Sequence, residues 1–156
     1  MKPAPTGWRV EWGVTAFAVW QSLPPLVVAW RHSPLDRWGW VALLVWLLPL
    51  AAPRPPGPRA LWPFTVAVAA LVIGILGSLH AAAYLALALT VFGWRGWSPA
   101  NAVWLLTGLG WMPLLTWLAK ELSFPQLLAL RFVLVLVGVT VAWLGARRAA
   151  PARSPA

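Results

Sequence analysis

The longest stretch of the chain without a charged residue runs from Ala60 to Trp94, and its length restricts the folds that are open to the chain. As one straight helix, these 35 residues would measure about 52 Å, whereas the hydrocarbon core of a bilayer is about 30 Å thick. Gly74, Gly77 and Ser78 cluster just before His80, and all three lower helix persistence relative to Ala or Leu. The sequence therefore predicts a break at this cluster and a hairpin of two shorter helices.

The composition is typical of a membrane protein. Hydrophobic residues make up 61% of the chain and charged residues only 10%, compared with about 25% charged residues in a typical soluble domain. A soluble chain of 156 residues could not bury that much apolar surface in one core. We predict an all-α, polytopic membrane helix bundle in the bacterial cytoplasmic (inner) membrane, with the lipid bilayer as a partner.

Six transmembrane helices are expected from the uncharged segments. Their approximate ranges are 12–30, 38–52, 60–77, 80–94, 99–119 and 125–146, and a short basic Pro/Ala-rich tail follows at 147–156. A five-span alternative stays open, in which region 60–94 is one tilted or kinked helix. Small residues at four-residue spacing favour this alternative, because they would form one packing stripe on an unbroken helix: Ala70, Gly74, Ser78, Ala82 and Ala86.

The basic residues favour six spans. Twelve Lys and Arg against three acids give a net charge of +9, which in a soluble protein would suggest nucleic-acid binding. Here the basic residues lie singly or in pairs between apolar segments, so we interpret them as signals for membrane orientation and expect no nucleic-acid partner. With Arg131 set aside as part of the sixth span, six spans divide the basic residues eight against three, whereas five spans divide them five against six. The larger group marks the cytoplasmic side and includes both termini: Lys2, Arg9, Arg54, Arg59, Arg95, Arg147, Arg148 and Arg153.

Prolines and glycines within the expected spans predict irregular helices and close packing. Pro24 and Pro25 are expected to kink the first span, because each ring removes an amide donor and clashes with the preceding turn. Gly108, Gly110 and Pro113 are expected to give the fifth span a flexible, kinked centre, as in the binding sites of transporters. Small residues expected at helix contacts are Gly74, Ser78, Gly138 and Ala142.

Three ionisable residues, His80, Arg131 and His32, are candidates for function, because such groups in or near membrane spans are costly. At the hairpin turn His80 would face the non-cytoplasmic headgroups; the alternative is a role in proton transfer or ligand binding. Arg131 lies six residues after Pro125, within reach of the headgroups or of an ion pair with Glu121. The alternative for Arg131 is the binding of an anionic group.

Several kinds of reactive site are excluded by residues that the sequence lacks. The chain has no cysteine, and therefore no thiolate nucleophile, disulfide, haem-attachment motif or cysteine-based zinc site. Two isolated histidines fall short of the three or four ligands of a zinc site, and the three acids form no paired-carboxylate site. We therefore expect no metal, no cofactor and no catalytic residue.

Fourteen tryptophans are unusual for this length, and most lie near the ends of the expected spans. There an indole can place its ring in lipid and its N–H in the headgroup layer. Four lie deeper, where they either pack between helices or line a groove for a lipid or substrate: Trp20, Trp46, Trp104 and Trp111.

From Asp36 onward, the stretch "DRWGWVALLVWLLP" precedes a Pro/Arg-rich loop, and "LVIGILGSLHAAAYLALALTVFGW", "WLLTGLGWMPLLTW" and "LRFVLVLVGVTV" follow. This order of features resembles the N-terminal part of the exosortase/archaeosortase family of multipass membrane proteins. The family's cleavage and transfer of sorting-signal proteins is associated with a cysteine nucleophile plus arginine and histidine. Because this chain has no cysteine, the resemblance implies a truncated or accessory relative rather than a peptidase.

The scarcity of reactive groups beside abundant tryptophans and small-residue faces predicts a non-enzymatic accessory or assembly subunit. It would act through other membrane protein subunits or through self-association, in a system for envelope protein sorting or export. One alternative is a small oligomeric transporter with a pathway near residues 108–113. Another is a membrane enzyme or cofactor carrier that uses His80 and Arg131.

Overall fold

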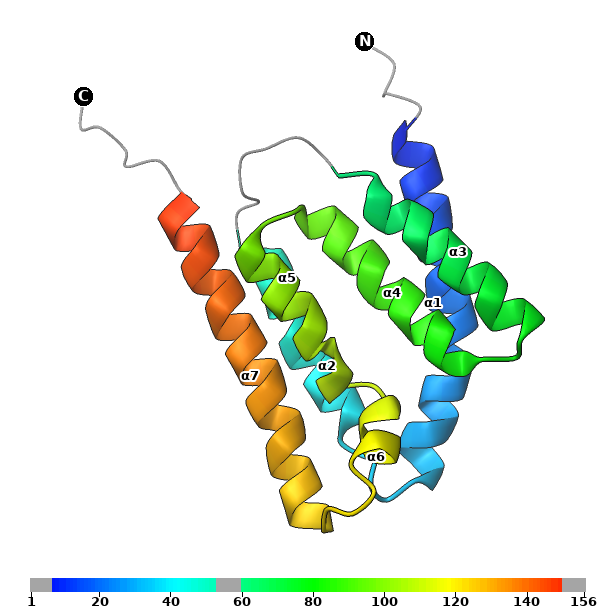
Figure 1. Cartoon of the computed structure of the whole chain (residues 1–156), viewed down its shortest axis with the longest axis vertical. Coiled ribbons are helices and arrows are strands. Elements are labelled where there is room, and N and C mark those ends of the chain that lie inside the picture. Colours follow the sequence, from blue (N-terminus) through cyan, green and yellow to red (C-terminus); the bar gives the residue numbers. More distant parts are fainter. Residues whose placement is uncertain (1–6, 53–59, 150–156) are drawn as a thin grey trace.

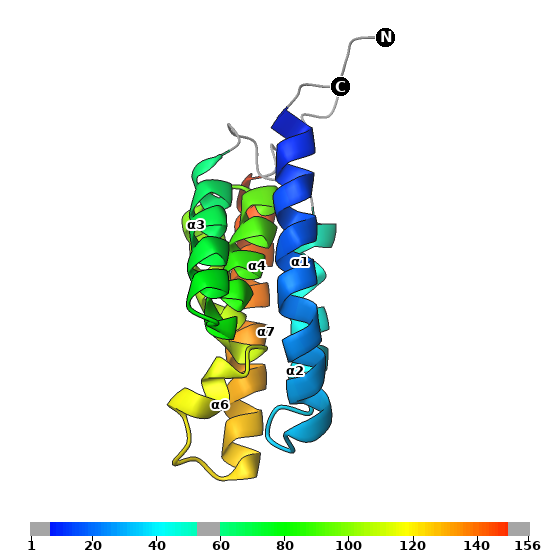
Figure 2. The ribbon, with the colours of Figure 1, turned by 90° about the vertical axis from the view of Figure 1, so that its right-hand side faces the viewer.

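The structure is a computed structural model, a bundle of helices that run back and forth along one axis (Figure 1). It describes residues 7–52 and 60–149, with side chains from Val10 to Ala52 and from Ala60 to Arg148, and these ranges contain helices and no strand. The all-α class predicted from the composition is confirmed for this part of the chain. Both the start of the first helix and the end of the last lie at one end of the bundle, called the N-terminal end below (Figures 1 and 2).

Seven α-helices and two 3₁₀ helices make up the described part of the chain. In order they are α1 (Gly7–His32), α2 (Gly39–Leu47), η1 (Leu48–Ala51), α3 (Trp62–Leu76), α4 (His80–Arg95), α5 (Pro99–Leu106), η2 (Thr107–Gly110), α6 (Leu114–Leu118) and α7 (Phe124–Ala149).

Two of these helices contain segments that are long and apolar enough to cross a membrane. They are Val10–His32 in α1 and Phe124–Arg148 in α7, and two shorter apolar segments lie at Gly39–Ala51 and Trp62–Leu76. This criterion considers only the length and composition of a helix, and the core helix of a soluble protein or a signal sequence can also meet it. The structure therefore allows a membrane location without showing how many times the chain crosses.

The helix is interrupted between α3 and α4, at the cluster of glycines and serine where the sequence predicts a break. Helix α3 ends at Leu76 and α4 begins at His80. Ser78 has a left-handed backbone with φ of 52°, and the Leu79 amide donates to the Gly74 carbonyl at 2.9 Å. Region 60–94 is thus two helices, and the unbroken helix of the five-span alternative is not formed.

The row of small residues lies between these two helices rather than along one of them. A methyl group at Gly74 would lie 3.5 Å from Cβ of Ala82 on α4, and Ala70 and Ala86 are buried in one cluster. Ser78, however, lies in the exposed turn and does not pack between helices. The prediction that Ser78 is a packing residue is therefore wrong, because it assumed that the helix continues through it.

The expected span at 99–119 is interrupted rather than only kinked. Helix α5 starts at a cap, where the Ser98 hydroxyl accepts from the Asn101 amide at 3.0 Å, and it ends at Leu106. The 3₁₀ helix η2, a turn and the five-residue α6 follow. Glycines at 108 and 110 disfavour the α-helix, and Pro113 cannot donate a backbone hydrogen bond. By contrast, α1 continues through Pro24 and Pro25 to His32.

The helices form two groups, each centred on a cluster of buried apolar side chains. Helices α1, α3 and α4 contact one another around small side chains, including Ala18, Ala67 and Ala86. Helices α2, α5 and α7, with η2, surround the large rings of Trp46, Trp104 and Trp111, and this second cluster also includes Leu26 of α1 and Tyr84 of α4.

Candidate functional site

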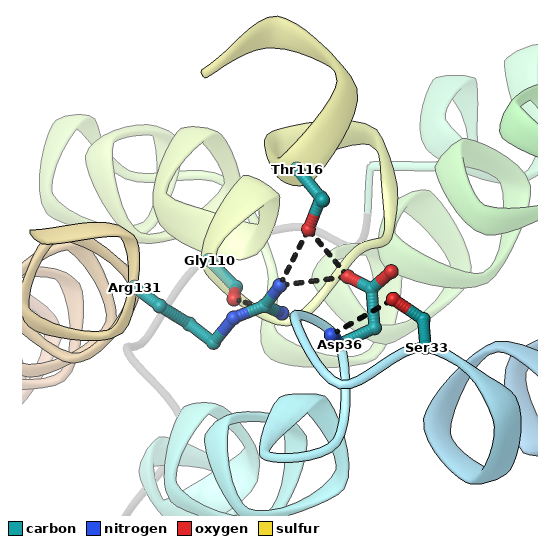
Figure 3. Close-up of polar contacts among 5 residues, drawn as sticks. All are labelled: Ser33, Asp36, Gly110, Thr116 and Arg131. Carbon is teal, nitrogen blue, oxygen red and sulfur yellow. Dashed lines mark hydrogen bonds and ion pairs between the residues drawn. The ribbon is translucent and has the colours of Figure 1, made fainter. Parts of the chain in front are cut away.

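The candidate site is a buried cluster of polar groups around Arg131, which lies in the second turn of α7 (Figure 3). The Arg131 side chain is fully buried and crosses from α7 to the turn between α1 and α2. One terminal nitrogen, Nη2, lies 2.9 Å from Oδ1 of Asp36 and 3.1 Å from Oγ1 of Thr116. The other, Nη1, donates to the carbonyl of Gly110 at 2.9 Å. The cluster therefore joins segments that are far apart in the sequence.

Asp36 is held by the turn that follows α1. Its backbone amide donates to Oγ of Ser33 at 3.2 Å, and its carbonyl accepts from the Gly39 amide at 2.7 Å, at the start of α2. A serine hydroxyl that accepts an amide three residues later is a local turn motif, so the conformation of the turn is encoded nearby. The carboxylate points from this turn towards α6 and α7 (Figure 3).

The interruption after α5 supplies the remaining groups. Gly110 ends η2, and its carbonyl accepts from Arg131. Thr116 lies on α6, and its hydroxyl donates to Oδ1 of Asp36 at 2.6 Å. In a continuous α-helix over this segment, the carbonyl of Gly110 would accept a hydrogen bond from the backbone amide four residues later. The break is therefore what makes this carbonyl available to the guanidinium.

The electrostatics explain why an arginine is tolerated here. The positive charge of Arg131 lies beside the negative charge of Asp36, whose side chain is 8% exposed, so the pair is neutral. Removing both charges from water is expensive, and this cost is recovered only where geometry and further hydrogen bonds are good. Thr116 and Gly110 supply such bonds, whereas Nε of Arg131 is buried without a hydrogen bond within the described residues. The arrangement can lock three segments together, and it presents no open face to a substrate.

The structure corrects the expected environment of Arg131. The prediction of a guanidinium at the headgroups or paired with Glu121 is wrong, because α7 turns this side chain into the bundle. Glu121 is exposed and lies 4.0 Å from Lys120. Asp36, one of the three acids of the chain, is buried as the partner of Arg131. A signal existed in the sequence, because a buried arginine needs a carboxylate and only three acids are available.

The two histidines do not form one site. His80 is the first residue of α4, exposed, and lines a pocket with Gln21 of α1. His32 ends α1 and is also exposed, 11 residues or about 16 Å further along the helix than Gln21. Within the described residues, no three His, Cys, Asp or Glu side chains are grouped in a way that could hold a metal ion.

Tryptophans fill the bundle beside residues 108–113. Trp46 and Trp104 are stacked with ring centroids 4.6 Å apart, and each indole N–H donates to the other residue's backbone carbonyl at 2.8 Å. Trp111 is 5.8 Å from Trp46, and all three rings are fully buried. Of the four deep tryptophans, only Trp20 is exposed. These contacts support packing rather than an aromatic-lined groove for Trp46, Trp104 and Trp111.

Gly138 and Ala142 on α7 lie in this same half of the bundle. A methyl group at Gly138 would overlap the Thr107 side chain of η2, so the glycine allows the two backbones to approach closely. Ala142 is buried in the tryptophan cluster. Gly108 lies against Trp46, with a would-be methyl group 3.3 Å from that ring.

The pockets on the outer surface of the bundle include an apolar groove and a smaller pocket. An apolar groove of about 620 Å³ runs between α5 and α7, lined by Val103, Val141 and Leu144 and bordered by Arg148. A smaller pocket of about 260 Å³ lies at the turn between α3 and α4, with Gln21, Ser78 and His80 in its lining. Neither pocket contains the Arg131 cluster.

No family model, no curated protein and no solved structure matches the chain.

Proposed function

We propose that the chain is a non-enzymatic integral membrane protein, an accessory or assembly subunit of the bacterial cytoplasmic membrane. We further propose six membrane segments with both termini cytoplasmic: α1, α2 with η1, α3, α4, α5 to α6, and α7. The single observation that carries the subunit proposal is that both terminal nitrogens of Arg131 bind acceptors of the chain itself. The buried charge is thus used to hold helices together and not to contact a substrate.

The outer surfaces support this proposal. Helices α1 and α7 expose large apolar side chains along their length, which suit lipid or the helices of another subunit. They include Val10, Phe17, Trp20, Val28, Val133, Leu136, Val137 and Leu144.

The link to envelope protein sorting or export comes from the resemblance of residues from Asp36 onward to exosortases and archaeosortases. A strain that lacks this chain would then process a sorting-signal protein incorrectly. A strain carrying Arg131→Lys, which keeps the charge, would retain part of the correct processing. Normal processing without the chain would contradict the link.

Size in native membranes tests the subunit role. The protein is extracted with a mild detergent and separated by native electrophoresis beside the same protein purified alone. We expect a complex larger than the purified chain. Co-migration with the purified chain would contradict the role.

A small oligomeric transporter is the second candidate, and the polar pocket beside Gln21 and His80 favours it. The pathway expected near Gly108–Pro113 is not supported, because Trp46 and Trp111 pack there. An enzyme that uses His80 and Arg131 together is disfavoured, because Arg131 is bound inside the bundle and His80 lies on its surface.

A further inference from the structure

The turn between α3 and α4 lies beside the middle of α1, not at an end of the bundle. Gln21 of α1 and His80 of α4 line one pocket. Ser22, which follows Gln21 on α1, donates its hydroxyl to the carbonyl of Ala83 on α4 at 2.9 Å. Both views of the ribbon agree, because the turn stops well short of the ends of α1 and α7 that lie away from the N-terminal end (Figures 1 and 2).

The middle of α1 is also the middle of its uncharged segment. Gln21 lies ten residues from Glu11 and ten from Arg31, the charged residues that border this segment. If α1 crosses a bilayer, its charged borders lie near the two interfaces and Gln21 lies near the midplane. The turn that contacts Gln21 then lies at that depth too.

Helix lengths lead to the same result. Helices α3 and α4 have 15 and 16 residues, about 22–24 Å, whereas α1 and α7 have 26 residues each, about 39 Å. A hairpin that starts at the N-terminal end and runs obliquely beside α1 therefore ends short of the far end of α1 (Figures 1 and 2).

The pocket at this turn has polar groups that need a partner. Gln21, Ser78 and His80 each contribute hydrogen-bonding atoms to its lining, and no described residue forms a hydrogen bond with these three side chains. Ser78 and His80 are exposed at the surface of the bundle. Polar groups that face hydrocarbon without partners are avoided in membrane proteins, so irregular backbone at this depth is found where it lines a cavity with water.

We propose that α3 and α4 form a re-entrant hairpin that ends near the middle of the bilayer. The pocket lined by Gln21, Ser78 and His80 is a site for water and small hydrogen-bonding solutes, open to the non-cytoplasmic side. Helices α3 and α4 separate the pocket from the cytoplasmic side, because they pack on α1 between the turn and the N-terminal end of the bundle. This inference rests on the proposed membrane crossing of α1 and α7.

Single cysteines test the inference, and the chain has no native cysteine to interfere. The variants are His80→Cys and Ser78→Cys in the pocket, Arg37→Cys in the exposed turn after α1, Val72→Cys on the outer face of α3 and Arg148→Cys at the end of α7. Each is treated in intact cells with a small membrane-impermeant methanethiosulfonate cation, or with a maleimide on a polyethylene glycol chain too large for the pocket.

We expect the small reagent to label His80→Cys and Ser78→Cys from outside the cell, and the large reagent to fail with both. Arg37→Cys is expected to react with both reagents and Val72→Cys with neither. Labelling of His80→Cys by the large reagent would place the turn at the surface and overturn the inference. Failure of both reagents at both pocket positions would show that the pocket is not open to water, and would overturn it equally.

The remaining variants separate this inference from the proposed function. Arg148→Cys must stay unlabelled in intact cells and react after the membrane is opened. If Arg148→Cys and Arg37→Cys react from the same side, α7 does not cross as proposed and the membrane arrangement itself fails. If those two behave as expected and only the pocket positions do not, the crossings of α1 and α7 stand and the re-entrant hairpin is wrong.

Discussion

The two groups of helices are held together by different means. Helices α1, α3 and α4 meet through alanines and Gly74 and, nearer the N-terminal end, through the ring of Trp94; their polar contacts include Ser22 to Ala83 and Trp94 to Thr15. Helices α2, α5 and α7 meet through paired tryptophans and the Arg131 cluster. Small residues allow close backbones and depend on many weak contacts, whereas the second group concentrates its stability in a few specific groups. Single substitutions are therefore expected to be most damaging in the second group.

Arg131→Ala is expected to have the largest effect. It leaves Asp36 as a buried charge without its partner, and the loss of one member of a buried pair costs about 3–5 kcal/mol. Thermal unfolding in detergent micelles, followed by tryptophan fluorescence, measures this loss against Arg147→Ala, an exposed control.

A second variant tests whether charge is the cause. The double variant Asp36→Asn with Arg131→Gln keeps the approximate size of the groups and leaves no buried charge. We expect it to unfold at a higher temperature than Arg131→Ala. An equal or lower temperature would mean that the shape of the cluster, not its charge, is what matters.

Gly138→Ala is expected to have the next largest effect, about 1–3 kcal/mol, because the added methyl group would overlap Thr107 and overpack the contact between α7 and η2. The matched control in the other helix group is Gly74→Ala, where the nearest atom to the added methyl group would be the carbonyl oxygen of Leu79 at 3.3 Å, a tight contact but not an overlap. Unfolding temperatures that fall equally in both variants would contradict the proposed difference between the groups.

Trp46→Phe removes one donor from the reciprocal tryptophan pair and leaves the buried carbonyl of Trp104 without it. The carbonyl keeps the Thr107 hydroxyl as a donor at 2.7 Å, so we expect only the loss of one hydrogen bond, about 0.5–1.5 kcal/mol. Trp20→Phe is the control, since Trp20 is exposed on α1, and its unfolding temperature is expected to stay close to that of the unaltered protein.

The smallest effect is expected for Ser22→Ala, which removes the bond between α1 and α4. Hydrogen bonds between membrane helices contribute about 0.6 kcal/mol on average. A loss as large as that of Arg131→Ala, in the same unfolding assay, would show that the first helix group also depends on a single polar contact.

Local features were predictable because their causes lie within a few residues. Gly77 and Ser78 end one helix before His80 begins the next, and Gly108, Gly110 and Pro113 mark the place where the fifth segment is irregular. The degree of irregularity was underestimated there, because the sequence signals a weak point but does not say which contacts replace the helical ladder. Those contacts come from Arg131, on another helix.

The sequence by itself determined that the described chain is helical and that a helix breaks just before His80, because helix propensity and turn chemistry act between neighbours. Only the tertiary structure decided that Asp36 is the partner of Arg131, 95 residues away, and that Trp46 and Trp104 bond to each other across 58 residues. It also decided that the turn before His80 lies beside Gln21. Each of these pairings depends on how the helices cross and rotate, which is set by the packing of the whole bundle and not by the neighbours of either partner in the sequence.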